Sequence, residues 1–201
     1  MMAGLLLTLR GTPFIFEGQE IGMTNGDFRD LSEVADIESH NIYAMAKSLG
    51  IPAKIRWKMI RRTSRDNART PMQWSDGEGA GFTCGKPWLK INGNYKEVNV
   101  QTENEKENGV LSFWKRMVAL RKSNEVLCEG EFRALYEGKR VYAFERRLGG
   151  KRLVSVCNMS AKTVRLPKAL GNSGDMILSS YNETACGKLM PFEFRLLESE
   201  E

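Results

Sequence analysis

The segment SRDNARTPMQW, from Ser64 to Trp74, places Arg65, Asp66, Asn67 and Arg69 within five positions. It is too polar for a buried helix, and its proline restricts the preceding residue to extended backbone, so the sequence predicts a loop. A guanidinium group is a rigid fork of donors that fits carboxylates and pairs of hydroxyl groups. The residues alone leave two interpretations open: a loop that faces a ligand, or a loop whose charges tie it to its own domain.

Length and charge limit what the rest of the chain can be. The chain has 201 residues, of which 41% are hydrophobic and 27% charged, as in an ordinary globular protein. A complete (β/α)8 barrel takes about 250 residues, so the chain is too short for a full barrel and a second domain. The net charge is +5, with much of the excess between Arg56 and Arg69. Because Asp66 interrupts this basic stretch and no recognition motif accompanies it, we expect no nucleic-acid partner.

The cysteine pattern and the apolar start of the chain bear on metals and location. The chain contains four cysteines: Cys84, Cys128, Cys157 and Cys186. None forms a C-x-x-C pair and His40 is the single histidine, so we expect no metal site and no cofactor. Free thiols are typical of a reducing compartment, which favours a cytoplasmic protein. Met1–Leu9 is too short to span a membrane and lacks the basic residues of a signal peptide, so we expect no membrane partner.

The first half of the chain reads as helices around one buried strand. Met1–Leu9 predicts the end of a helix, with Gly11 as its stop, and Phe14-Ile15-Phe16 is typical of a strand buried on both faces. Apolar residues then recur at helical spacing in two further segments. We expect the first of these helices to be capped by Ser32 and to end at Gly50, and the second to open at Pro52.

The second half changes from helical to alternating periodicity. Val110–Arg121 follows a helical period and ends in cations, which suit a helix C-terminus. After Asn124 the period falls to two, and turn signals such as Gly149-Gly150 and Gly171-Asn172 separate the apolar runs. The expected strands are Glu131–Tyr136, Arg140–Arg147, Arg152–Asn158, Thr163–Leu166, Met176–Ser180 and Phe192–Leu196. Short strands at this spacing predict an antiparallel β-sandwich.

Two long stretches resemble one enzyme family. They are GTPFIFEGQEIGMTN (Gly11–Asn25) and Ser64–Trp74 with its continuation AGFTCGKPWLKINGNYKEVNV (Ala80–Val100). Both resemble the α-glucosidases of glycoside hydrolase family 13, in the branch of oligo-1,6-glucosidase, trehalose-6-phosphate hydrolase and sucrose isomerase. The resemblance implies the C-terminal portion of a (β/α)8 barrel over residues 1–126, comprising its last strand, a helical insert and its last helix. A C-terminal β-sandwich domain over residues 127–201 follows.

The resemblance also implies a function. Retaining glycosidases use two carboxylates about 5 Å apart. In the family these lie on strands that precede the equivalent of Met1, so no catalytic residue is expected here. Where the family usually has Gln-Gly-Glu-Glu, this chain has Glu17-Gly18-Gln19-Glu20, and we expect Glu20 to be a buried structural carboxylate. By resemblance, Arg65 hydrogen-bonds sugar hydroxyls.

In the same resemblance, three neighbours of Arg65 support it: Asp66, Asn67 and Arg69. Together the four are the expected substrate-binding residues, for an α-glucoside in the full-length enzyme.

Three functional interpretations follow. The favoured one is the C-terminal part of an α-glucosidase, inactive alone. The others are half of a split enzyme that needs an N-terminal partner chain, and a non-catalytic sugar-binding or interaction module. Because a few barrel elements leave apolar faces uncovered, the first two predict docking to the missing barrel portion or self-association. Family members with these motifs act on oligo-1,6-glucosides, trehalose phosphate or sucrose, so the motifs do not distinguish the linkage.

Overall fold

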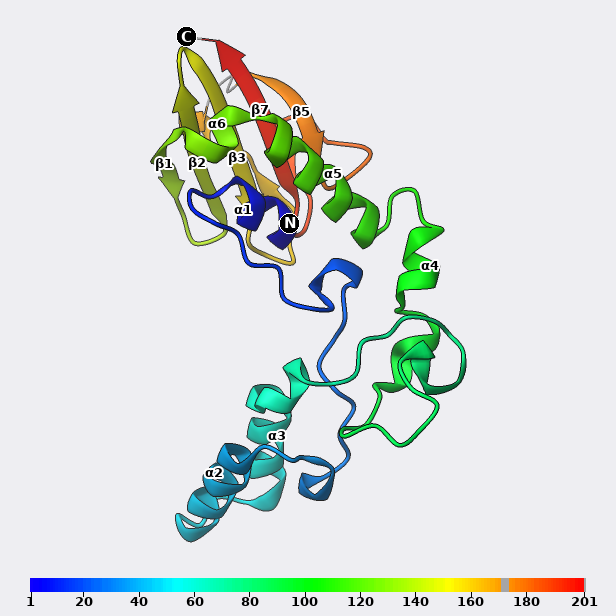
Figure 1. Ribbon diagram of the computed structural model, residues 1–201. Helices are drawn as coiled ribbons and strands as arrows, with labels where there is room; N and C mark the ends of the chain where they lie inside the picture. Colours follow the sequence, from blue (N-terminus) through cyan, green and yellow to red (C-terminus); the bar gives the residue numbers. More distant parts are fainter. Residues whose placement is uncertain (171–173, 201) are drawn as a thin grey trace. The chain divides into compact units, whose positions relative to one another are not determined.

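The computed structural model describes residues 1–170 and 174–200 (Figure 1). The chain folds into two compact units, whose residues contact mainly other residues of the same unit, and each unit has its own hydrophobic clusters. The first unit joins Met1–Phe14 to Ser112–Glu201, and the second is Ile15–Leu111. The division into domains 1–126 and 127–201 stays a prediction.

The first unit is built on a five-stranded antiparallel sheet with the spatial order β1-β2-β3-β7-β5. Its strands are β1 (Glu131–Glu137), β2 (Val141–Leu148), β3 (Lys151–Asn158), β5 (Asp175–Ser179) and β7 (Phe194–Glu200). The short strands β4 (Val164–Arg165) and β6 (Lys188–Leu189) pair in a separate ladder. The predicted antiparallel strands are therefore confirmed. The strand β6 is not among those predicted, because two residues are too short to show an alternating pattern. The expected turn at Gly171-Asn172 lies outside the described residues.

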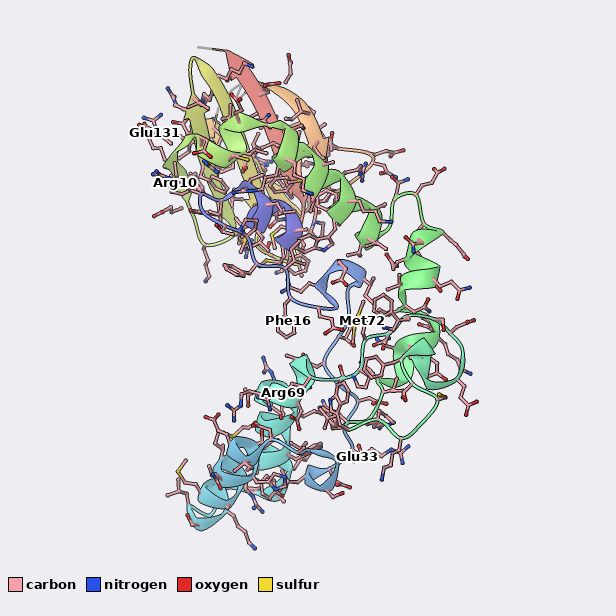
Figure 2. All side chains as sticks on the ribbon, in the orientation of Figure 1. Arg10, Phe16, Glu33, Arg69, Met72 and Glu131 are labelled. Atoms are coloured by element: carbon pink, nitrogen blue, oxygen red, sulfur yellow. The ribbon has the colours of Figure 1, made fainter. Side chains whose placement is uncertain are left out.

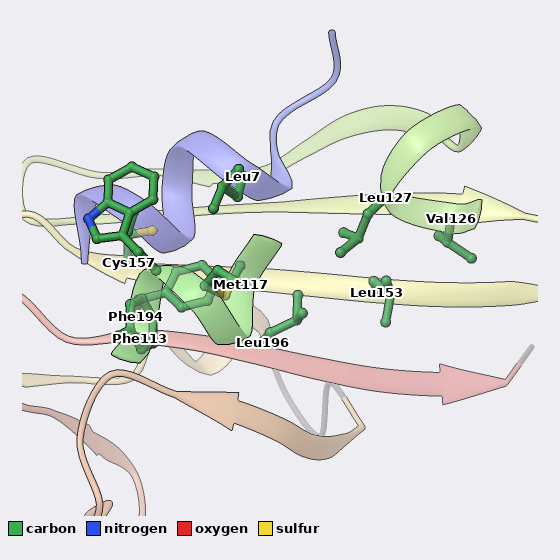
Figure 3. Packing of buried hydrophobic residues seen from close by; sticks show 11 residues of the cluster. Leu7, Phe113, Met117, Val126, Leu127, Leu153, Cys157, Phe194 and Leu196 are labelled. Carbon is green, nitrogen blue, oxygen red and sulfur yellow. The ribbon is translucent and has the colours of Figure 1, made fainter. Parts of the chain in front are cut away.

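Helices cover one face of this sheet. They are α1 (Met2–Thr8), α5 (Val110–Ser123, of which Ser112 onward belongs to this unit) and α6 (Glu125–Glu129). Figure 3 shows Leu7, Met117 and Leu127 of these helices packed with Leu153 and Phe194 of the sheet. Along β3, the side chains that alternate with Leu153 point to the opposite face of the sheet. There they form a second cluster together with side chains from η6 (Lys168–Leu170) and β6. Alternation along the strands thus builds two apolar layers.

The buried Arg146 side chain ties the helices to the sheet. Its Nη1 donates to the carbonyl oxygens of Thr8 and Leu127 at 3.0 and 2.8 Å. Its Nε and Nη2 both donate to the carbonyl oxygen of Gly130, at 3.1 and 2.8 Å. Burial lowers the pKa of the guanidinium, and these carbonyl dipoles compensate the cost of holding the charge inside. One side chain therefore fixes the ends of α1 and α6 over β2.

The second unit is a pair of packed helices followed by turns and loops. α2 (Ile37–Ser48) and α3 (Ala53–Thr63) pack together, and Gly50 between them takes the positive φ of 75° that glycine tolerates. Phe28, Val34 and Ile60 form the cluster at their base. The other elements are η1 (Gln19–Ile21), η2 (Leu31–Glu33), η3 (Arg65–Ala68), η4 (Glu78–Gly81), η5 (Gly93–Lys96) and α4 (Val100–Asn104).

The predicted strand at Phe14-Ile15-Phe16 is wrong for this chain. The three residues form no strand among those described, and all three side chains are exposed, Phe14 at 83%. A strand buried on both faces needs a neighbouring strand on each side to pair its backbone. No described segment pairs with this one, so the apolar run stays extended and uncovered.

Two helix ends also differ from the predictions. α1 ends at Thr8 with Leu9 in extended backbone, so Gly11 is not its stop. α2 begins after Asp36, well beyond Ser32. The Ser32 N–H and hydroxyl groups both bond to Asp30 in a 3-10 turn, which uses them before the helix starts.

A substitution at Gly4 tests how closely α1 packs against the sheet. A Cβ added at Gly4 would overlap the Phe194 ring. Glycine to alanine in an exposed helix ordinarily gains about 1 kcal/mol, so a Gly4→Ala variant would be stabilised if α1 were loosely packed. We expect instead a loss of about 1–3 kcal/mol, the usual cost of overpacking. Urea unfolding measures the change, and Gly85→Ala, whose nearest neighbour is 3.7 Å away, is the control.

Candidate functional site

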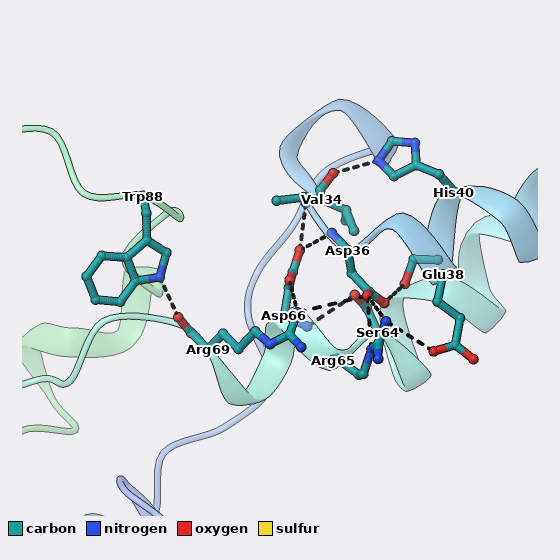
Figure 4. Close-up of polar contacts among 11 residues, drawn as sticks. Val34, Asp36, Glu38, His40, Ser64, Arg65, Asp66, Arg69 and Trp88 are labelled. Atoms are coloured by element: carbon teal, nitrogen blue, oxygen red, sulfur yellow. Dashed lines mark hydrogen bonds and ion pairs between the residues drawn. The ribbon is translucent and has the colours of Figure 1, made fainter.

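The Ser64–Trp74 segment leaves α3 through the single turn η3 (Figure 4). Ser64 caps this turn, because its Oγ accepts a hydrogen bond from the N–H of Asp66 at 3.3 Å. α3 ends at Thr63, and the side chains that follow Ser64 point in different directions. The four predicted substrate-binding residues consequently have different surroundings.

Asp66 fastens the loop to the start of α2. Its side chain is buried, and Oδ2 accepts hydrogen bonds from the N–H groups of Ala35 and Asp36 at 2.6 and 3.0 Å. Backbone N–H groups at the beginning of a helix favour a negative charge, so they compensate the cost of burying this carboxylate. This contact spans about thirty positions of sequence and fixes the loop against the helix pair.

Arg65 turns back onto the same junction. Its Nε and Nη2 donate to Asp36 Oδ1 at 3.0 and 2.7 Å, and Nη2 lies 3.2 Å from Glu38 Oε2. The other oxygen of Asp36 accepts from Ser39 at 2.7 Å. The hydrogen bonds from Arg65 lower the pKa of Asp36 to about 2, and the same pairing raises the pKa of Arg65. Arg65 is therefore a permanent donor whose side chain is still 55% exposed.

Asn67 and Arg69 connect the loop to neighbouring segments. Asn67 Oδ1 accepts from the N–H of Gly26 at 3.1 Å, and its Nδ2 donates to the Arg61 carbonyl at 3.1 Å. Arg69 lies 3.6 Å from Asp66 Oδ1, which is an ion-pair distance, and 52% of its side chain is exposed. Its carbonyl accepts a hydrogen bond from the indole of Trp88 at 2.9 Å. Arg69 thus has a neutralising neighbour and a guanidinium open to solvent.

A pocket of about 350 Å³ opens beside Arg69, and we call it the Arg69 pocket. Figure 2 labels Arg69 and Met72 of its lining. The lining residues are Glu17, Ala68, Arg69, Thr70, Met72, Phe82 and Trp88. Phe82 and Trp88 meet edge to face with ring centroids 5.2 Å apart, and Trp88 is 67% exposed.

An aromatic face beside charged donors and acceptors suits a sugar ring, whose faces are apolar and whose rim is hydroxylated. Among the described residues that line the Arg69 pocket, Glu17 is the only carboxylate. The pocket therefore offers contacts for binding a sugar, and it lacks the pair of carboxylates that a retaining mechanism needs.

Sequence reasoning misses Asp36, the partner of Arg65. The sequence shows it only as one of several acidic residues before α2, and its pattern Asp-x-x-Ser at a helix start is the available signal. His40 also has a structural contact, because its Nε2 lies 2.7 Å from the carbonyl oxygen of Val34 and donates to it. Glu20 is half-buried, and its Oε2 has no hydrogen-bond partner among the described residues.

Metal ligands and membrane-spanning segments would be visible in the side-chain clusters and the helices. Within residues 1–170 and 174–200, no three His, Cys, Asp or Glu side chains gather as a metal site would require. Over the same residues, no helix is both long enough and apolar enough to cross a bilayer. The four cysteines are free, and burial raises the pKa of the Cys157 thiol to about 12.

Comparison with known proteins gives consistent matches. The family model of the alpha-amylase catalytic domain matches residues 1–130. Oligo-1,6-glucosidase of Parageobacillus thermoglucosidasius is 36% identical over 99% of this chain, and trehalose-6-phosphate hydrolase of Escherichia coli is 34% identical over 96%. Among solved structures, trehalose-6-phosphate hydrolase of Bacillus licheniformis aligns over the whole chain with a TM-score of 0.90 at 30% identity.

These relatives are longer than the chain. The chain spans 36% of each of the two curated relatives named above and 38% of the Bacillus licheniformis structure. Isomaltulose synthase of Klebsiella sp. LX3 aligns with a TM-score of 0.90 at 36% identity, and 37% of that chain is covered. About a third of each relative therefore corresponds to this chain.

The Asp36–Arg65 pair predicts a pH dependence. Because the pKa of Asp36 in the folded chain lies below its ordinary value of 3.8, the pair stabilises the fold above about pH 4. This contribution is lost as the pH falls toward 2. Carboxyl ¹³C shifts followed against pH should give a midpoint near 2 for Asp36, and Arg65→Gln should raise it. A midpoint unchanged in Arg65→Gln, or one equally raised in the distant control Lys58→Gln, would contradict the assignment.

Proposed function

The chain belongs to the alpha-amylase family of glycoside hydrolases, and from this membership we propose that it supplies the substrate-positioning part of a retaining α-glucosidase. The proposed substrates are short α-glucosides of the oligo-1,6-glucosidase kind. The observation that carries the proposal is the charged Ser64–Trp74 loop, held by buried hydrogen bonds and bordered by the Arg69 pocket. In the proposed domain arrangement, residues 1–126 are the last strand, helical insert and last helix of a (β/α)8 barrel. Residues 127–201 form the β-sandwich domain.

The proposed role of the loop is to bind and orient the sugar. Arg65 and Arg69 present guanidinium donors that are about half exposed. Arg65 is paired with the buried carboxylate of Asp36, and Arg69 with that of Asp66. A guanidinium whose pKa is raised by a carboxylate stays charged, so Arg65 donates hydrogen bonds and takes no proton. Orientation of this kind raises the rate by holding the substrate in a reactive geometry.

Cleavage of the glycosidic bond is proposed to come from outside this sequence. A nucleophile and an acid/base about 5 Å apart are required, and the Arg69 pocket offers Glu17 alone among its described lining residues. Asp66 is buried, its Oδ2 accepts from two backbone N–H groups and its Oδ1 lies 3.6 Å from Arg69, and it is not one of the residues that line the pocket. We therefore place the catalytic carboxylates in the portion of the relatives that this chain does not cover.

The exposed run Phe14-Ile15-Phe16 favours a second form of the same proposal. Three consecutive apolar side chains in uncovered extended backbone are suited to pairing with further barrel strands. These strands would belong either to the same polypeptide or to a separate N-terminal partner chain, as in a split enzyme. The free thiols agree with a reducing compartment such as the cytoplasm.

A chimaera tests the proposal. This chain replaces the matching segment of the Parageobacillus thermoglucosidasius oligo-1,6-glucosidase, and hydrolysis of a chromogenic α-glucoside is measured. We expect activity in the chimaera and none in the 201-residue chain alone. A folded chimaera without activity, or activity in the isolated chain, would contradict the proposal; circular dichroism checks folding. Mixing the chain with the remaining portion of that enzyme as a separate polypeptide tests the split form.

Variants of the chimaera separate positioning from folding. Arg69→Gln and Arg65→Gln each remove a charged donor, and we expect kcat/KM to fall about tenfold to a hundredfold, as for a hydrogen bond to a charged group. The control Lys58→Gln removes an exposed cation of α3 and should leave kcat/KM within twofold. Equal losses in all three variants would show that net charge, and not the loop, sets the rate.

A further inference from the structure

A second pocket, of about 660 Å³, lies between the C-terminal end of α3 and the segment Asn25–Arg29. We call it the arginine pocket. Its lining residues are Asn25, Gly26, Asp27, Phe28, Arg29, Trp57, Arg61 and Arg62. None of the residues of the Arg69 pocket is among them. The glucosidase proposal therefore assigns this pocket no role.

The charge of the arginine pocket is strongly positive. Three of its lining residues are arginines, and Arg29, Arg61 and Arg62 make no ion pair among the described residues. Asp27 is the one carboxylate in the described lining, and Lys90 Nζ, which lies 3.2 Å from Asp27 and 3.5 Å from Glu33, offsets part of its charge. Cations at the end of a helix are expected because they complement the helix dipole, which accounts for Arg61 and Arg62. It does not account for Arg29, which comes from a different segment.

Hydrogen bonds hold the two walls of the pocket together. Asn67 bridges them directly, since it donates to the Arg61 carbonyl on α3 and accepts from Gly26 in the opposite wall, both at 3.1 Å. Asn92 Nδ2 donates to the carbonyl of Asn25 at 3.0 Å, and Lys90 Nζ to that of Asp27 at 3.0 Å. The backbone around Arg29 is thereby ordered before any ligand arrives, which lowers the entropic cost of binding.

We propose that the arginine pocket binds the phosphate group of a small phosphomonoester. Guanidinium forks match phosphate oxygens two at a time, and clusters of arginines are a recurring way to recognise phosphate. The half-buried Trp57 ring in the lining adds an apolar surface against which a sugar carrier packs. The inference rests on these residues alone and does not depend on the glucosidase proposal.

Calorimetric titration of the 201-residue chain tests the inference with three probes at constant ionic strength: inorganic phosphate, glucose 6-phosphate and glucose. We expect both phosphates to bind and glucose not to bind. Tighter binding of glucose 6-phosphate than of inorganic phosphate would show that a sugar phosphate is the preferred source, and equal binding that the free anion suffices. No saturable binding of either phosphate, or equal binding of glucose, would overturn the inference.

Three variants and one control locate the site. Arg29→Gln, Arg61→Gln and Arg62→Gln change exposed side chains, and each should weaken phosphate binding about tenfold or more. Lys58→Gln removes an exposed cation of the same helix that does not line the pocket, and it should change binding less than twofold. Unchanged binding in all three arginine variants, or an equal loss in Lys58→Gln, would also overturn the inference. Thermal melts confirm that each variant is folded.

Discussion

Two buried carboxylates, Asp36 and Asp66, meet where the Ser64–Trp74 loop crosses the start of α2, and the arrangement of the site depends on how their charges are satisfied. A buried charge costs several kcal/mol unless it is paired and hydrogen-bonded. Backbone N–H groups serve Asp66, while Arg65 and Ser39 serve Asp36. These contacts hold the loop against the helices, so its position does not depend on regular secondary structure.

This junction borders the Arg69 pocket and the arginine pocket, which both lie in the second unit. On one side Arg69, paired with Asp66, borders the Arg69 pocket. On the other side Asn67, two residues earlier, bridges the walls of the arginine pocket. The single 3-10 turn thus gives three consecutive polar residues, Arg65 to Asn67, and the following Arg69 different contacts. Of the two interpretations left open by the sequence, internal support is visible in the hydrogen bonds of the loop, and ligand contact stays a proposal.

Sequence patterns predicted the parts of the fold that depend on local periodicity. The alternation along β3 and the helical spacing of α5 reappear as buried faces, because neighbours within the chain cover them. Phe14-Ile15-Phe16 has an equally clear pattern and forms no strand, because a strand also needs partners for its backbone. The Arg65–Asp36 pair joins residues 29 positions apart and leaves no periodic trace. Pairings of this kind follow from the tertiary arrangement, so the support of the site emerged only from the structure.

Amide hydrogen exchange at Ala35 and Asp36 is the most direct measurement of the central constraint. If the Asp66 carboxylate holds both N–H groups, they are protected in the chain, and Asp66→Ala accelerates their exchange about tenfold to a hundredfold. Protection inside α2, which Asp66 does not contact through hydrogen bonds, changes much less. Fast exchange of both amides in the unaltered chain, or exchange unaffected by Asp66→Ala, would contradict the account of how the loop is held.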